Sequence, residues 1–174
     1  QFLIKKLPLD GVKIVPNSAS LAPFLADHRA AKQGYIISEP FVAKQEGASV
    51  RSLLVANFGF NPYTSVLMTS DATVEQRPEF VQTMIAASRR GWEKYLADPA
   101  ETNKRIHELN PEMGLEILDF GVQAIKEHCI GRDVQSDQIG RMTIERWSTL
   151  VSQMEELQML APGVVAPASL FLAE

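Results

Sequence analysis

The sequence predicts an α/β protein, and three features of the residue order lead to that expectation. Two short β-type runs, at residues 12–15 and 34–38, flank a helical segment at 21–26, which is the order of a βαβ unit. Two further β-type runs follow at 50–58 and 63–70. From there on the pattern changes to long amphipathic helices, and helices packed on a sheet are the architecture that such an order favours.

The first residues predict the end of a helix and then a strand. Residues 1–7 have the amphipathic pattern of final helical turns, so we expect further residues to precede Gln1 in the natural protein. Residues 12–15 are rich in β-branched side chains, and Pro16 ends the run because proline has no N–H to donate to a ladder.

A helix and a second strand complete the predicted βαβ unit. Residues 17–20 supply amide and hydroxyl side chains that are typical of a helix N-cap, and the helix is expected at 21–26. The second strand, at 34–38, is apolar at its centre and is stopped by Pro40. The two strands of such a unit are parallel and joined by a right-handed crossover.

The second half of the chain predicts helices that each bury one face. Prolines at 78, 99 and 111 mark where helices begin or end, and apolar residues recur between them at helical spacing. Trp92 and Trp147 lie on such apolar faces, so we interpret both as packing residues rather than ligand-stacking residues. The helices are expected at 78–97, 99–109, 113–127 and 143–159.

Composition excludes several classes of function. The chain has 174 residues, 45% of them apolar, which is enough for a folded core. Its net charge is −4 and no Lys/Arg run exceeds a pair, so we expect no nucleic-acid partner. No apolar run approaches the roughly 20 residues needed to span a bilayer, so we expect no membrane insertion in this segment.

Motifs for catalysis and metal binding are missing from the sequence. We find no paired catalytic carboxylates, Ser-His-Asp order, phosphate-binding Gly-rich loop or H-E-x-x-H motif, and therefore expect a binding protein, not an enzyme. His128 and Cys129 are adjacent, but His28 and His107 are far away in sequence. We interpret the adjacent pair as the end of a helix, and expect neither a metal nor a cofactor.

The candidate ligand-binding residues lie at the predicted ends of the two strands. In open α/β sheets, ligands bind beyond the carboxyl ends of the strands. There, Tyr35 would stack on a flat molecule, while Ser38 and Glu39 would bond to it. Ser18 and Ser20 lie at the expected helix N-terminus, where unpaired N–H groups suit a polar ligand edge. The alternatives are a packed tyrosine, a solvated glutamate and two plain helix caps.

The ordered series of motifs resembles the solute-binding proteins of ABC importers that carry an NMT1/THI5-like domain. That group resembles proteins for nitrate, taurine, aliphatic sulfonates and thiamine-pyrimidine precursors. The resemblance covers about residues 6–160 and corresponds to the second half of such a protein. The motifs that carry it are LAPFLAD at 21–27, QGYIISEPF at 33–41, GFNPY at 59–63, RPEFVQ at 77–82, Gly91-Trp92 and YLADP at 95–99.

The resemblance implies a fold and a location. The fold is periplasmic-binding-protein-like, of type II, with two α/β lobes that close on a ligand by a hinge. Residues 1–47 would be the latter part of the second lobe, 48–60 the crossover or hinge, and 61–174 the C-terminal helical part of the first lobe. The protein would be periplasmic or extracytoplasmic, with its signal segment outside this chain, and would serve the membrane subunits of an ABC importer.

The resemblance also bears on the ligand. In thiamine-pyrimidine binders of this group, a tyrosine stacks on the ring and a glutamate four residues later holds its polar edge, and Tyr35 and Glu39 have that spacing. A carboxylate in such a site needs donors, which an aminopyrimidine supplies, whereas Glu39 would repel a sulfonate or nitrate. We therefore expect a neutral or cationic heteroaromatic solute.

There are three alternatives to this function. One is an anion binder of the sulfonate or nitrate type, and another is a ligand-sensing domain of the same fold. The third, a pyrimidine-synthesising enzyme of the THI5 type, is disfavoured because those enzymes carry a cluster of cysteines and this chain has only Cys129.

Overall fold

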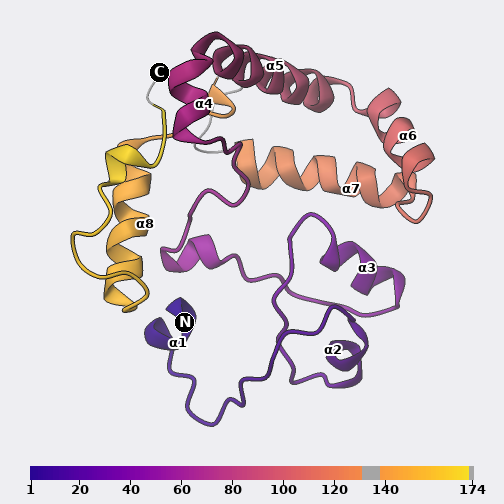
Figure 1. Ribbon diagram of the computed structural model, residues 1–174. Helices are drawn as coiled ribbons and strands as arrows, with labels where there is room; N and C mark the ends of the chain where they lie inside the picture. Colours follow the sequence, from indigo (N-terminus) through magenta and orange to yellow (C-terminus); the bar gives the residue numbers. More distant parts are fainter. Residues whose placement is uncertain (131–137, 173–174) are drawn as a thin grey trace. The chain divides into compact units, whose positions relative to one another are not determined.

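The computed structural model describes residues 1–130 and 138–172, and the regular elements in these ranges are helices (Figure 1). The chain divides into two compact units. Unit 1 comprises residues 1–13, 53–78 and 140–174, and unit 2 comprises residues 14–52 and 79–139. Our division of the chain at residues 48–60 stays a prediction.

The expectation of an α/β fold is wrong, because no β-strand forms in the described part of the chain. Outside the helices, the backbone hydrogen bonds found there connect residues three to five positions apart. That is the geometry of turns, whereas a sheet needs bonds between two separate extended segments. The two-lobe, periplasmic-binding-protein-like α/β architecture is therefore not what this chain forms.

The predicted strands fail because their β-type side chains have no neighbouring strand. Val12, Ile14 and Val15 lie in a segment without regular secondary structure, with 57%, 60% and 62% of their surface exposed. Residues 63–70 are irregular, and the run at 50–58 contains a short 3-10 helix, η1 (Val55–Phe58). β-Propensity expresses packing within a sheet, so it does not produce a strand where no partner runs alongside.

The segment at 34–38 forms a turn instead of a strand. The N–H of Ser38 donates to the carbonyl of Tyr35 at 3.2 Å, and the chain passes directly into α3 (Glu39–Gln45). Pro40, which we interpreted as the end of a strand, stands in the first turn of that helix. Proline is favoured there, because the first N–H groups of a helix have no intrahelical partner.

In its described residues, unit 2 contains four helices that form close to the positions that the sequence predicts, and α3, which the sequence analysis did not predict. Proline and apolar spacing identified the four predicted helices, with differences of a few residues at their ends. The helices are α2 (Ala22–Ala26), α3, α5 (Pro78–Ala97, its first residue counted with unit 1), α6 (Ala100–Leu109) and α7 (Leu115–Ile125), the last continuing into a π-helical turn, η2 (Lys126–Ile130).

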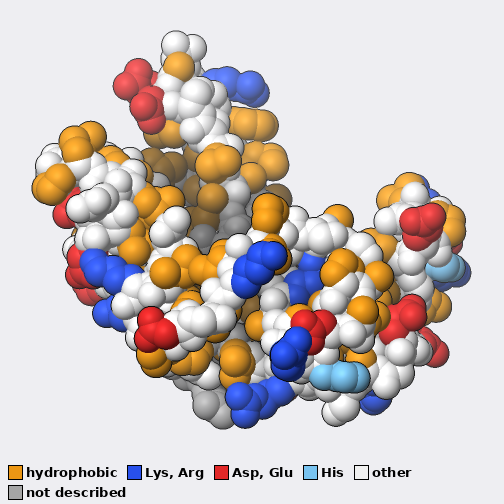
Figure 2. Space-filling model, turned by 90° about the horizontal axis from the view of Figure 1, so that it is seen from below, with side chains coloured by type: hydrophobic (Ala, Val, Ile, Leu, Met, Phe, Trp, Pro, Cys, Tyr) orange, Lys and Arg blue, Asp and Glu red, His pale blue; other side chains and the backbone are white. Residues whose placement is uncertain are grey.

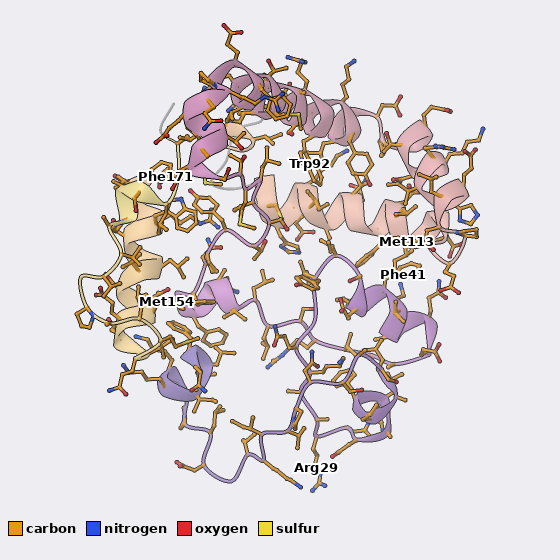
Figure 3. The ribbon with its side chains drawn as sticks, viewed as in Figure 1. Arg29, Phe41, Trp92, Met113, Met154 and Phe171 are labelled. Carbon is orange, nitrogen blue, oxygen red and sulfur yellow. The ribbon has the colours of Figure 1, made fainter. Side chains whose placement is uncertain are left out.

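The core of unit 2 is built around α7 and holds α3 in place. Val122 of α7 has 1% of its surface exposed. The rings of Phe41 and Phe120 lie 5.4 Å apart, and Phe41 is labelled on α3 in Figure 3. Because Glu39 begins the same helix, this packing also positions Glu39. The other buried apolar residues of unit 2 are Ala43, Val81, Leu96, Leu118 and Ala124.

Unit 1 is assembled from short elements around α8. The indole of Trp147 packs between Tyr63, at 5.6 Å between ring centroids, and Phe171, at 6.4 Å; Phe171 is labelled in Figure 3. Phe2 and Phe60 form a second ring pair, at 5.0 Å. The elements are α1 (Phe2–Lys6), η1, α4 (Asp71–Gln76), α8 (Ile144–Glu156) and η4 (Pro167–Ser169).

Many apolar side chains lie on the surface, where Figure 2 shows hydrophobic and charged groups interspersed. Met68 has 83% of its surface exposed, and Trp92 has 47%, although its ring meets the edge of Tyr95 at 5.9 Å. Trp92 is therefore only partly packed. None of the helices in the described ranges is both long enough and apolar enough to span a bilayer.

Candidate functional site

A pocket of about 180 Å³ in unit 2 contains three of the five predicted site residues, Ser18, Tyr35 and Glu39. Two loops and the start of α3 form it, so residues 13 to 22 positions apart in the sequence meet at one opening. Ser38 directly precedes Glu39, and Ser20 lies in the first loop, but neither lines the pocket. The full lining is Asn17, Ser18, Ala19, Lys32, Gln33, Gly34, Tyr35 and Glu39.

The carboxylate of Glu39 is fixed by the turn that precedes it. Its Oε2 accepts from the N–H of Tyr35 at 2.8 Å and from the hydroxyl of Ser38. Gly34 makes this fold-back possible, because a Cβ at that position would lie 3.0 Å from both Cβ and Cγ of Glu39. Ser38 thus acts on the site through Glu39, while Glu39 itself is held in one orientation at the pocket.

The protonation of Glu39 follows from these contacts. Burial favours the neutral acid and by itself would raise the pKa of Glu39. The hydrogen bonds from Ser38 and from the Tyr35 N–H, together with the nearby charge of Lys32, outweigh burial and hold the pKa below its usual value. Glu39 is therefore a carboxylate at neutral pH and acts as a hydrogen-bond acceptor.

Tyr35 presents its ring at the surface. Tyr35 has 67% of its surface exposed, while its backbone N–H donates to the carboxylate of Glu39. The ring is thus not packed in a core, contrary to the alternative interpretation of this residue. An exposed ring on a fixed backbone is a surface on which a flat molecule stacks.

Lys32 is a pocket residue that the sequence did not indicate. Its ammonium donates to Oδ1 of Asn17 at 2.9 Å and to the carbonyl of Ser18. It therefore joins the two loops that line the pocket. The signal was weak, since a single lysine three residues before a tyrosine has no distinctive motif.

Ser18 and Ser20 do not occupy the N-cap position that we expected. The helix α2 begins one residue later than expected, at Ala22, with Leu21 as its N-cap. The hydroxyl of Ser18 accepts from the Ser20 N–H at 3.2 Å, and that of Ser20 accepts from the Ala22 N–H at 3.1 Å. Both hydroxyls thus shape the loop, and only Ser18 lines the pocket.

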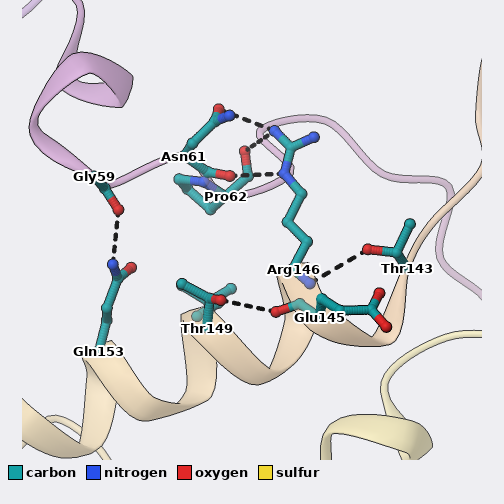
Figure 4. Close-up of a pocket in the computed structure, with 9 residues that line it drawn as sticks. Gly59, Asn61, Pro62, Thr143, Glu145, Arg146, Thr149 and Gln153 are labelled. Carbon is teal, nitrogen blue, oxygen red and sulfur yellow. Dashed lines mark hydrogen bonds between the residues drawn. The ribbon is translucent and has the colours of Figure 1, made fainter. Parts of the chain in front are cut away.

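A second pocket, of about 300 Å³, lies in unit 1 between α8 and the loop after η1 (Figure 4). Arg146 dominates it: Nε donates to the Asn61 carbonyl at 2.7 Å, and Nη2 donates to Asn61 Oδ1 at 3.0 Å and to the Pro62 carbonyl at 3.2 Å. The guanidinium also stacks on Tyr63 at 4.2 Å. These groups are paired with one another, so we assign this pocket to the attachment of the loop to α8.

The adjacent His128 and Cys129 lie in the π-helical turn η2. His128 Nε2 is 3.9 Å from Glu127 Oε1, and Cys129 is exposed. Across the described ranges, no three His, Cys, Asp or Glu side chains gather in a way that suits a metal ion.

Comparison with known families identifies the chain. The family model described as NMT1/THI5 like matches residues 5–102, which is more than half of the chain. The chain belongs to the NMT1/THI5-like family. All residues that line the pocket of unit 2 fall inside the matched range, whereas the α8 side of the unit 1 pocket falls outside it.

A named relative and the solved structures complete the comparison. Over 94 residues the chain is 33% identical to a riboflavin-binding protein, RibY, of Chloroflexus aurantiacus. The matched stretch is 54% of this chain and 26% of the relative, so the chain spans about a quarter of that relative's length. No solved structure matches the chain.

Proposed function

We propose that this NMT1/THI5-like protein binds a small heteroaromatic solute at the pocket of unit 2 and releases it unchanged. The observation that carries the proposal is the exposed Tyr35 ring beside a carboxylate that is held in place by two hydrogen bonds. The ring supplies a stacking surface, and Glu39 supplies an acceptor for a ligand N–H. The relative is named a riboflavin-binding protein, and riboflavin has both a flat ring that can stack and an N–H that can donate.

The wider role in this proposal is that of an extracytoplasmic solute-binding component that delivers its ligand to the membrane subunits of an ABC importer. Family membership supports it. A sensor domain is the alternative. Cell fractionation and uptake of labelled solute by a deletion strain separate the two roles, because uptake requires a transport receptor and does not require a sensor domain.

The first test is calorimetry on the complete natural protein with riboflavin, an aminopyrimidine, a sulfonate and nitrate. We expect Tyr35→Ala to weaken binding of the aromatic ligands by roughly fivefold or more, because stacking contributes about 1 kcal/mol beyond buried area. Tyr35→Phe keeps the ring and is expected to keep the affinity. Equal affinity in Tyr35→Ala and the parent would remove the ring from the site.

The second half of the test concerns the carboxylate. Glu39→Gln replaces a charged acceptor by a neutral amide, so we expect weaker binding of ligands that present an N–H. Glu46→Gln is the matched control, because Glu46 is an exposed residue at the end of the same helix. Preferential binding of sulfonate or nitrate would instead support the anion binder, and chemical conversion of a bound solute would overturn a pure binding role.

A further inference from the structure

We propose that Lys32 is a specificity-determining residue of the unit 2 pocket, which together with Glu39 selects a neutral heteroaromatic ring whose edge carries a carbonyl beside an N–H. This inference rests on the proposed function and narrows its ligand class. It excludes the cationic heteroaromatic ligands that the sequence left open.

The first step is the position of the ammonium. Lys32 lines the same pocket as Tyr35 and Glu39, and its side chain is half-buried. Asn17 Oδ1 and the Ser18 carbonyl accept two of its hydrogen bonds. A lysine ammonium has three N–H donors, so a third is left for an acceptor on a ligand. The tethers hold this donor in place before a ligand arrives, which reduces the entropy lost on binding.

The second step is the acceptor. The two hydrogen bonds that fix Glu39 both end on Oε2. A carboxylate has about four acceptor positions, so Oε1 is able to accept from a ligand N–H. One part of the pocket therefore donates and another accepts, and Tyr35 lines the same pocket.

The third step is charge. Lys32 and Glu39 are the charged side chains among the lining residues, and they have opposite signs. For a cationic ligand the attraction of Glu39 is offset by the repulsion of Lys32, and for an anionic ligand the reverse holds, so the pair favours neither charge. A neutral edge with one acceptor and one donor makes a favourable contact with both groups. Imide and amide edges of flavin and pyrimidinedione rings have this pattern.

The fourth step is size. The pocket has a volume of about 180 Å³, below the range of roughly 300–1,000 Å³ that encloses drug-sized ligands. It holds the polar edge of a ring and not a whole tricyclic molecule. Discrimination should therefore depend on the edge chemistry of the probe, so small changes at that edge are the sharpest test.

The experiment measures binding of three probes to the complete protein: lumichrome, its N1,N3-dimethyl derivative, which lacks both ring N–H groups beside the carbonyls, and 4-amino-5-hydroxymethyl-2-methylpyrimidine, which has no carbonyl. We expect the parent protein to prefer lumichrome over both others. Lys32→Met should weaken the binding of lumichrome by about tenfold and the binding of the aminopyrimidine much less. The preference for lumichrome over the aminopyrimidine then shrinks or inverts. Lys32→Arg should keep the preference, and Lys44→Met, an exposed lysine of α3, is the control.

The outcomes separate this inference from the proposed function. If Lys32→Met weakens all probes equally, Lys32 only supports the loops and the inference is wrong, although heteroaromatic binding stands. If the parent binds the N1,N3-dimethyl derivative as well as lumichrome, the donor–acceptor edge is not recognised and the inference is also wrong. If the parent binds no aromatic probe, both the inference and the proposed function are wrong.

Discussion

At the scale of single residues, one buried asparagine joins the three long helices of unit 2. Asn103 of α6 has 1% of its surface exposed. Its Oδ1 accepts from the Tyr95 hydroxyl on α5 at 2.9 Å, and its Nδ2 donates to Asp119 on α7 at 2.7 Å. Burial, and then the charge of Asp119, raise the pKa of Tyr95, which keeps its hydroxyl protonated and able to donate.

We expect Asn103→Ala to lower the free energy of unfolding by about 1–3 kcal/mol, because it leaves the Tyr95 hydroxyl and Asp119 without their partner. Urea unfolding followed by circular dichroism measures the change. Asn57→Ala, at an exposed position of η1, is the control and should change stability little. If both variants unfolded at the same urea concentration as the parent, the hydrogen bonds of Asn103 would not contribute to the stability of the protein.

Two of the predicted site residues, Tyr35 and Glu39, are related locally in the sequence. The prediction used their spacing of four, and in the structure a hydrogen bond joins them across one turn. Lys32 was missed because its partners, Asn17 and Ser18, lie 15 and 14 residues away. No periodicity records a contact between two loops, so this part of the pocket depends on the folded chain.

At the scale of elements, helices were predictable and strands were not. A helix forms its hydrogen bonds within itself, so apolar spacing and prolines indicate α5, α6, α7 and α8 from local sequence. A strand needs a second strand, and the β-type run at 12–15 has none in the described chain. Pro40 gave an ambiguous signal, because proline ends strands and also begins helices.

Two helical glycines give a matched prediction at this scale. Gly91 lies within α5 with no atom within 4 Å of a Cβ built on it, whereas a Cβ on Gly121 of α7 would lie 3.2 Å from the Ile37 carbonyl oxygen. Alanine is favoured over glycine by about 1 kcal/mol in a helix interior. We expect Gly91→Ala to stabilise the protein by up to that amount.

The same exchange at position 121 should gain less or lose stability, because the new methyl group pushes against the backbone just before α3. Thermal unfolding of both variants under identical conditions compares them. Equal gains in melting temperature would show that the contact between α7 and Ile37 is not tight in solution.

At the scale of the whole molecule, the sequence pattern did not predict which stretches of the chain form each unit. Unit 1 combines three separate stretches of chain and unit 2 combines two. The resemblance to the NMT1/THI5-like family was correct, yet the α/β fold inferred with it was not. Family motifs lie in local segments, so family membership could be predicted from the sequence. Fold class depends on which distant segments pair, so it could not be predicted in the same way.

The two units have unequal cores, and this leads to a prediction about cooperativity. Among the described residues, Phe2 and Val151 are the buried apolar side chains of unit 1, while unit 2 has six, from Ala43 to Ala124. Burial of apolar surface is the main stabilising term in folding, so unit 1 should be the less stable. Unfolding should then occur in two steps and not as one all-or-none transition.

Each unit carries one tryptophan, which allows the steps to be separated. Trp147 belongs to unit 1 and Trp92 to unit 2. In Trp92→Phe, fluorescence reports Trp147 and should show unfolding at the lower urea concentration. In Trp147→Phe, it reports Trp92 and should show the higher midpoint, since any destabilisation by that change falls on the other unit. Coincident midpoints in both variants would mean that the units unfold together, and that the small core of unit 1 gains its stability from the rest of the chain.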